Sequence, residues 1–323
     1  MKKKEKPKAV PRNKQVIALC VSDIHLSHKC PVARSAEPSW YDAMARVLGQ
    51  LTDLKEQYGD VPILCAGDVF DKCGSCSEIT NFAIKHLPQM YCISGQHDQR
   101  YHSYADIQKT SYWTLVEAGV IVNLAPEESV DIKSGDDEGV KLRLWGFPWG
   151  YEVKKPSISE RGVLNIAIIH QYLWRNRCGY PGASEESNIL SLGDSLLGCD
   201  AAIFGDNHIS FTAKTRDCSI LNPGCLIRRK ADEKKYTPTV GLLYGDASFG
   251  TVKLDISEDK WIKTKKVDEK TEEDNLELTE FMAELENLGT DSLDFREVIL
   301  RYIKDNKVSD MTETILLEAM ECS

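Results

Sequence analysis

Histidines and aspartates recur along the first two thirds of the chain, each directly after a short apolar run. The five segments are Asp23-Ile24-His25, Gly67-Asp68 with Asp71, Gln96-His97-Asp98, His170, and Asp206-Asn207-His208. Four of the seven histidines lie in these segments. Carboxylate oxygens and imidazole nitrogens gathered together are the ligands that a pair of divalent cations requires. One such segment occurs often by chance, but five in series predict a metal centre.

The apolar runs before these residues predict the strands that must position them. These runs are Val16–Val21, Val61–Ala66, Met90–Ser94, Leu164–Ile169 and Ala201–Phe204. Continuous apolar runs of this length are typical of buried strands, and the helical spacing of Trp40–Leu54 between two of them predicts layered α/β structure. Since ligands bind at strand ends in such folds, we expect the five segments to meet at one rim. Further strands are expected at Val120–Leu124, Val140–Trp145, Cys218–Leu221, Val240–Tyr244 and Thr251–Ile256, in a more antiparallel half.

The order of these motifs resembles the calcineurin-like metallophosphoesterase superfamily. Its pattern is D-x-H, G-D-x-x-D, G-N-H-D/E, a single histidine after a strand, and G-H-x-H; this chain has SDIH, GDVFD, GQHD, AIIH and GDNH. The turn Asn222-Pro223-Gly224 also looks like the family's continuation. The resemblance implies a sandwich of two packed mixed β-sheets flanked by helices. Within the superfamily, the chain looks most like DNA-repair exonucleases of SbcD type, particularly their phage and prophage versions.

The resemblance also implies a role for each motif residue. Asp23, His25 and His208 would hold the first metal ion, and Asp68 would bridge both ions. The second ion would be held by His170, Gln96 and Asp206. His97 would not be a ligand but would face the phosphate and either protonate the leaving oxygen or stabilise its charge, with Asp98 orienting its ring. Two such cations lower the pKa of a shared water and clamp the phosphoryl oxygens during in-line attack.

Two of these positions depart from the family pattern. Gln96 stands where the family has asparagine, and Asp206 stands where it has the first histidine of G-H-x-H. With Asp206, the protein carboxylates at the site become three, and the added oxygen ligand favours Mn²⁺, or else Mg²⁺, over nitrogen-preferring metals. Both departures fall on the second metal ion, so the alternative is that this position is weakened or lost.

The sequence therefore predicts a two-metal-dependent phosphodiesterase that acts on DNA as an exonuclease or endonuclease. The same metals would also serve a phosphatase or a nucleotide phosphodiesterase, and a non-catalytic scaffold with a weakened second metal site is a third alternative. Arg34, Arg100 and His102 are candidate contacts for substrate phosphates, with a solvated loop role as the alternative. The basic cluster 228–230 could contact a nucleic-acid backbone or be merely exposed.

Charge and periodicity divide the chain into four parts. We expect a basic arm over residues 1–14, a catalytic domain over 15–256, a charged linker over 257–275 and an acidic helical tail over 276–323. Residues 268–323 hold 17 acidic and 5 basic residues, so this end carries a net charge of −12 and the rest +2. The apolar stripe of the tail could bind an SMC-like ATPase of SbcC type, mediate a homodimer, or pack back on the domain.

The sequence also predicts a cytoplasmic protein. No apolar run approaches the roughly 20 residues that a membrane-spanning helix needs. The run after the basic N-terminus, VIALCV, is too short for the apolar core of a signal peptide. Several of the 11 cysteines lie inside apolar runs, where cysteine is typical of a small buried apolar residue rather than of a disulfide framework.

Overall fold

A computed structural model of the protein describes residues 14–126, 128–135, 139–154, 160–176, 179, 183–192 and 194–262. The expected basic arm lies outside these residues apart from Lys14, and the expected acidic tail lies wholly outside them. Across the described segments, no helix combines the length and the apolar character that a membrane crossing requires.

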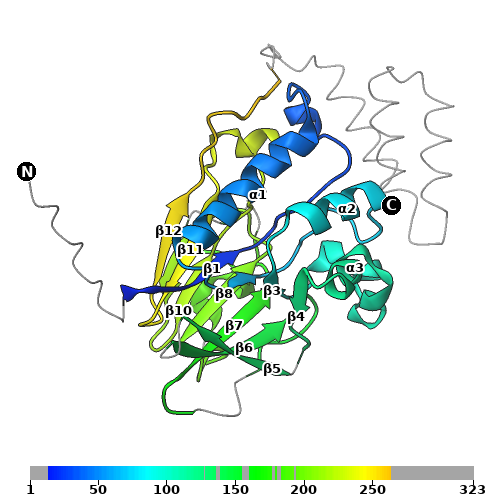
Figure 1. Ribbon diagram of the computed structural model, residues 1–323. Helices are drawn as coiled ribbons and strands as arrows, with labels where there is room; N and C mark the ends of the chain where they lie inside the picture. Colours follow the sequence, from blue (N-terminus) through cyan, green and yellow to red (C-terminus); the bar gives the residue numbers. More distant parts are fainter. Residues whose placement is uncertain are drawn as a thin grey trace, which may run out of the picture. The chain divides into compact units, whose positions relative to one another are not determined.

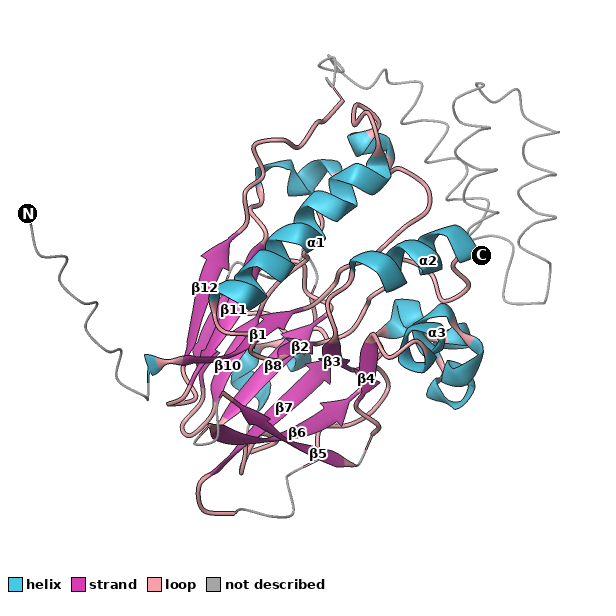
Figure 2. Ribbon diagram, in the orientation of Figure 1, coloured by secondary structure: helices cyan, strands magenta, loops and turns pink. Residues whose placement is uncertain are grey.

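Within the described residues, the strands form two six-stranded mixed sheets (Figure 1, Figure 2). The first sheet has the order β12 (Phe249–Lys253), β11 (Thr239–Tyr244), β1 (Val16–Val21), β2 (Ile63–Cys65), β3 (Met90–Cys92), β4 (Ile121–Asn123). The second has the order β5 (Ser129–Ser134), β6 (Val140–Phe147), β7 (Val163–His170), β8 (Ala201–Gly205), β10 (Ser219–Asn222), β9 (Phe211–Lys214). Strands β1 to β4 are parallel in the first sheet, as are β6, β7, β8 and β10 in the second. The expected sandwich of two mixed sheets is confirmed.

Three apolar layers hold the sheets and helices together. The helices α1 (Trp40–Gln57), α2 (Ser77–His86) and α3 (Ser111–Glu117) pack on one face of the first sheet. Leu19 and Val21 of β1 belong to this layer, whereas Ala18 and Cys20 belong to the layer between the two sheets. This alternation follows from the two-residue period of a strand, and it explains why β1 is apolar throughout. A third layer covers the other face of the second sheet.

The prediction of a more antiparallel half is correct only in part. Strands β11 and β12 pair in an antiparallel manner with each other, and β11 does so with β1, in the first sheet. In the second sheet only the edge strands β5 and β9 pair in an antiparallel manner, and β4 continues the parallel run of the first sheet after α3. The connection from β7 to β8 carries two 3-10 turns among its described residues, which the sequence pattern did not mark as a crossover. Strands β5 and β9 were not expected, because their alternating exposure leaves no continuous apolar run.

Residues 257–262, placed by the sequence at the start of the linker, lie against the catalytic domain. The backbone N–H of Ile262 donates to the carbonyl of Ala33 over 3.1 Å, and that of Lys260 donates to the Glu37 carboxylate over 2.7 Å. The compact unit accordingly extends to Ile262. Its end is therefore six residues later than the change in composition indicated.

Candidate metal centre

The five motif segments meet where the carboxyl ends of parallel strands from both sheets come together. They follow β1, β2, β3, β7 and β8. Backbone hydrogen bonds join the first two loops, because Asp23 N–H donates to the carbonyl of Gly67 and His25 N–H to that of Asp68, each over 3.0 Å. The third loop is joined through Asp68, whose Oδ1 accepts the backbone N–H of His97 over 3.0 Å. The structure thus confirms the prediction that these segments meet at one rim.

Four of the candidate ligands have a left-handed backbone. The φ angles are 50° at Asp23, 50° at His25, 54° at Asp68 and 81° at Asp206. For residues other than glycine this conformation costs roughly 1–3 kcal/mol each, and it persists where the surrounding structure imposes it, often at functional sites. At each position the chain leaves its strand in a sharp turn, and the hydrogen bonds between the loops hold that turn in place.

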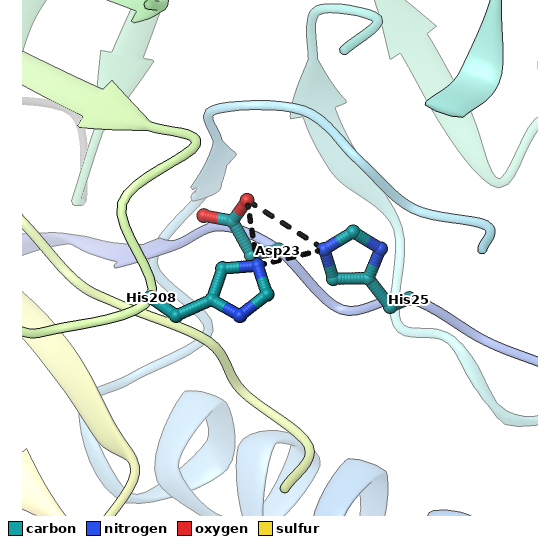
Figure 3. A group of neighbouring side chains, drawn as sticks. All are labelled: Asp23, His25 and His208. Atoms are coloured by element: carbon teal, nitrogen blue, oxygen red, sulfur yellow. Dashed lines mark hydrogen bonds and ion pairs between the residues drawn. The ribbon is translucent and has the colours of Figure 1, made fainter. Parts of the chain in front are cut away.

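The first group of candidate ligands consists of Asp23, His25 and His208 (Figure 3). The Nε2 atoms of His25 and His208 lie 3.1 Å apart, and Asp23 Oδ1 lies 3.8 Å and 4.0 Å from them, respectively. His208 donates Nδ1–H to a Glu233 carboxylate oxygen over 3.1 Å, which directs its Nε2 at the other two residues. Burial, followed by the charge of Arg229, lowers the pKa of His25 well below its usual value, so this ring is neutral. Burial opposes protonation of His208, but the hydrogen bond to Glu233 raises its pKa, so this ring must lose the Nε2 proton before it can bind a cation. Two ring nitrogens and a carboxylate that face one point then fit a cation.

The second group consists of Asp23, Asp68 and His170. His170 donates Nδ1–H to the carbonyl of Ala66 over 2.5 Å, and its buried Nε2 lies 3.4 Å from Asp68 Oδ2. Asp68 Oδ2 also lies 3.8 Å from His25 Nε2, so it is between the two groups, where a bridging ligand belongs. Both Asp68 Oδ2 and His170 Nε2 are buried without a hydrogen-bond partner. Such unpaired buried atoms are costly unless something binds them, and a cation would.

Charge coupling between these residues agrees with this arrangement. Burial disfavours the imidazolium of His170, but the neighbouring Asp68 carboxylate outweighs burial and raises the pKa of His170 to about 10. Burial likewise opposes ionisation of Asp68, yet His170 holds the pKa of that carboxyl below its usual value. A proton therefore compensates the buried carboxylate when no cation is bound. Because ligands must lose their protons before they coordinate, cation binding here releases protons.

Gln96 and Asp206, the two departures from the family pattern, contact each other. Gln96 Nε2 donates to Asp206 Oδ1 over 2.7 Å, while Gln96 Oε1 is buried and has no hydrogen-bond partner. The backbone N–H of Asp206 donates to both carboxylate oxygens of Asp23, over 3.1 Å and 3.2 Å. Both predicted ligands are therefore brought to the site, and each has an oxygen to offer.

Position 95, directly before Gln96, must be a glycine because there is no room for a side chain. A Cβ atom at this position would lie 2.1 Å from Asp68 Oδ1 and 2.6 Å from His170 Nε2. Any side chain would displace the carboxylate that stands between the two groups of ligands. The glycine therefore lets the loop after β3 approach the metal centre closely.

His97 stands at the exposed edge of the site. Its ring meets that of His25 edge-on with centroids 4.9 Å apart, and its Nδ1 lies 2.8 Å from the carbonyl oxygen of Asp71. A carbonyl oxygen only accepts, so Nδ1 carries the proton and Nε2 is the atom left for a substrate. To donate a proton from Nε2, the ring must therefore be the imidazolium.

Asp98 does not orient the ring of His97, contrary to the sequence prediction. Its carboxylate is fully buried and accepts backbone N–H groups from Val69, Phe70 and Gly95 over 3.0–3.1 Å. Burial raises the pKa of Asp98 to about 7, with Asp68 adding to the rise and the three N–H donors opposing it. Asp98 fixes the loops after β2 and β3 to each other, and the carbonyl of Asp71 holds the His97 ring instead.

Glu233 and Arg229 also join the site, although neither was predicted to belong to it. Besides His208, the Glu233 carboxylate accepts the backbone N–H groups of Arg229 over 2.5 Å and Lys230 over 2.9 Å. Arg229 in turn forms an ion pair with the Asp71 carboxylate, next to the carbonyl that holds His97. The loop 229–233 therefore connects a candidate metal ligand to the candidate acid. The basic cluster 228–230, predicted to contact nucleic acid or to be merely exposed, was the only signal in the sequence; in the structure Arg228 is buried, Arg229 is largely covered and Lys230 is exposed.

The three residues that were predicted to contact substrate phosphates differ in their exposure and partners. Arg34 is 2% exposed, and its guanidinium donates to the Glu37 carboxylate and the carbonyl of Arg228 while pairing with Asp259. Every side of the group is occupied by protein, so the structure gives Arg34 a structural role. Arg100 and His102 are exposed on the loop after the metal centre, and they stay predictions.

One known protein family matches the part of the chain that carries the five motif segments. The family model for calcineurin-like phosphoesterases matches residues 18–210. The chain belongs to this family. Members typically bind two divalent metal ions, and the two groups of side chains described above are the candidates for holding them in this chain. A search of curated proteins finds no match.

Several solved structures resemble the chain weakly. Calcineurin-like phosphoesterase YfkN from Bacillus subtilis is 14% identical with a TM-score of 0.40, over 76% of this chain and 87% of that one. A novel archaeal phosphodiesterase is 12% identical with a TM-score of 0.37, over 73% and 99%. A putative 5'-nucleotidase from Staphylococcus aureus is 12% identical with a TM-score of 0.45, over 82% and 58%. The family membership rests on the family model and on the site.

Proposed function

We propose that this phosphoesterase is a two-metal-dependent phosphodiesterase that hydrolyses DNA, as a nuclease of SbcD type. The observation that carries the proposal is the set of three carboxylates beside the two cation positions, Asp23, Asp68 and Asp206. Two divalent cations less three carboxylates leave about one net positive charge, which matches the single charge of a phosphodiester. A phosphomonoester carries nearly two negative charges at neutral pH and is neutralised less well.

Nearby charged groups do not change this balance much. Asp71 is paired with Arg229, and Glu233 accepts the Nδ1–H of His208. Burial opposes ionisation of Glu233, but its hydrogen bonds to His208 and to the loop backbone lower the pKa of this carboxyl to about 2. The negative charge of Glu233 is therefore matched by three N–H donors, and the net charge that a substrate meets is set by the cations and the three aspartates.

The residues divide the chemistry between them. When bound, the two cations supply an activated water and neutralise charge on the phosphoryl oxygens, and we infer that they are Mn²⁺ or Mg²⁺. His97 protonates the leaving oxygen from Nε2, because its Nδ1–H is held by the carbonyl of Asp71. Arg100 and His102 lie three and five residues beyond His97 on the exposed loop, where a nucleic-acid backbone can reach them.

A substrate panel tests the proposal. The purified protein with Mn²⁺ is given duplex DNA, single-stranded DNA, bis(p-nitrophenyl) phosphate and p-nitrophenyl phosphate, with Asp68→Ala as the inactive control. We expect the diester to be hydrolysed faster than the monoester, and DNA cleavage that weakens as salt rises. Dominant monoester hydrolysis without DNA cleavage at low salt would assign a phosphatase or a nucleotide-directed enzyme. If no substrate is hydrolysed, the protein would instead be the non-catalytic scaffold.

A further inference from the structure

Gln96 and Asp206 lie 110 positions apart in the sequence, and the fold brings their side chains into direct contact. The amide nitrogen of Gln96 donates to one carboxylate oxygen of Asp206 over 2.7 Å. The other end of the same amide, Gln96 Oε1, is buried without a partner, as are Asp68 Oδ2 and His170 Nε2. These three unpaired atoms come from three different strand ends, and two of them, Asp68 Oδ2 and His170 Nε2, belong to the second group of candidate ligands. The two departures from the family pattern called this second position into question.

Each of the two residues needs the other. An asparagine at position 96 is one methylene shorter, so its amide nitrogen would fall short of the Asp206 carboxylate. A histidine at position 206 that uses its lone pair on a cation has no acceptor left for the amide of Gln96. Either change alone leaves a polar group without a partner in a part-buried place, which weakens the site.

The two cation positions have unlike donor sets. The first combines oxygens of Asp23 and Asp68 with the two nitrogens of His25 and His208. The second group, Asp23, Asp68 and His170, offers a single nitrogen, and Gln96 and Asp206 would add further oxygens to it. Carboxylate and carbonyl oxygens suit Mn²⁺ and Mg²⁺, whereas imidazole suits Zn²⁺ and similar ions.

We propose that Gln96 and Asp206 form a matched pair that keeps the second cation position functional and makes it select a harder cation than the first. When both kinds of ion are offered together, an imidazole-preferring ion then takes the first position and Mn²⁺ or Mg²⁺ the second, whereas Mn²⁺ offered alone fills both positions. Metal binding is measured without substrate, so the proposal stands or falls independently of the DNA substrate proposed above.

A double-mutant cycle tests the pairing. Metal-free wild type, Gln96→Asn, Asp206→His and the double variant are titrated with Mn²⁺ by calorimetry, with thermal unfolding of each metal-free protein as the check on folding. We expect two Mn²⁺ per wild-type chain, a loss of about 10–100-fold in second-site affinity for each single variant, and recovery in the double variant. Gln89→Asn is the matched control, because Gln89 Nε2 contacts only the Gly119 carbonyl at the surface. A double variant whose loss equals the product of the single losses would overturn the pairing.

Asp206→Asn provides a second test that preserves shape. The amide oxygen of this asparagine can still accept from Gln96, so folding should be unchanged, while the loss of charge should weaken the second Mn²⁺. Undiminished affinity would contradict a role for Asp206 as a ligand. Binding of one Mn²⁺ per wild-type chain would contradict a functional second position.

Pulsed electron paramagnetic resonance tests the selectivity. The wild-type protein is loaded with one equivalent each of Zn²⁺ and Mn²⁺, and the nitrogen couplings of the Mn²⁺ signal are counted. We expect an isolated Mn²⁺ coupled to a single imidazole nitrogen, that of His170. Coupling to two imidazole nitrogens would place Mn²⁺ with His25 and His208 and overturn the proposed order of preference.

Discussion

Replacing Glu233 by glutamine should weaken metal binding, although this residue is not itself a predicted ligand. Its carboxylate accepts three N–H groups: Nδ1–H of His208 over 3.1 Å and the backbone N–H groups of Arg229 and Lys230 over 2.5 Å and 2.9 Å. Glutamine has one oxygen and one NH₂ group. If its oxygen faces the backbone, its NH₂ group faces His208 and favours the tautomer protonated at Nε2, which cannot coordinate a cation.

The size of the effect follows from the kind of contact that is lost. Residues that orient a histidine ligand through its other ring nitrogen typically change metal affinity by about 10–100-fold when mutated. This range corresponds to about 1.4–2.8 kcal/mol of binding free energy. In a calorimetric titration of Glu233→Gln, we expect this loss for the Mn²⁺ at the first position, which His208 helps to hold. The loss should be much smaller for the Mn²⁺ at the second position, because His170 is held by the carbonyl of Ala66 instead.

A matched control separates this effect from a general change in charge. Glu78 on α2 has a side chain 64% exposed and pairs with His28 at the surface, so Glu78→Gln should leave both affinities unchanged. Thermal unfolding of the metal-free proteins shows whether Glu233→Gln is folded. Wild-type affinity in a folded Glu233→Gln protein would refute the reasoning, because His208 would then not depend on its carboxylate partner.

Three further substitutions test separate parts of the account. Asp68→Ala should abolish hydrolysis with Mn²⁺ and reduce the number of bound ions, since one oxygen serves both positions; unchanged turnover would contradict a bridging role. His97→Asn should keep both ions while losing roughly 10²–10⁴ in rate, the usual scale for a general acid; loss of metal would make His97 a ligand. Arg34→Met should lower the free energy of unfolding by about 1.5–3 kcal/mol, because buried Glu37 loses its charged hydrogen bond to Arg34 and keeps only Arg46 and the N–H of Lys260, and Mn²⁺ affinity should be unchanged. A raised KM with unchanged stability would instead make Arg34 a phosphate contact.

The sequence predicted those parts of the site that depend only on residues close together along the chain. Each ligand follows an apolar run, and such runs form buried strands whatever their partners are, as β1 with six buried residues shows. The strands β5 and β9 lie at sheet edges and alternate in exposure, so their local pattern is weak. Their pairing is decided by the neighbouring strands, which no short window of sequence contains.

The groups that orient the ligands could not be predicted, because they come from distant loops. Glu233 lies 25 positions from His208, and Arg229 lies 158 positions from its partner Asp71. Arg34 looked like a loop arginine, yet its partner Asp259 comes from a segment that looked like linker. Asp98 was assigned to His97 by adjacency, whereas the turn of the backbone directs its carboxylate to three N–H groups of the loops after β2 and β3. Local spacing indicates which residues reach the site and leaves open what each one contacts there.

Anomalous scattering from Mn²⁺-soaked crystals would show whether two cations bind between these five loops. We expect two peaks about 3.5–4 Å apart, as in other two-metal sites. One peak should lie among Asp23, His25 and His208, the other beside His170, Gln96 and Asp206, with Asp68 between them. A single peak, or peaks away from these residues, would show that the five loops do not hold a pair of cations.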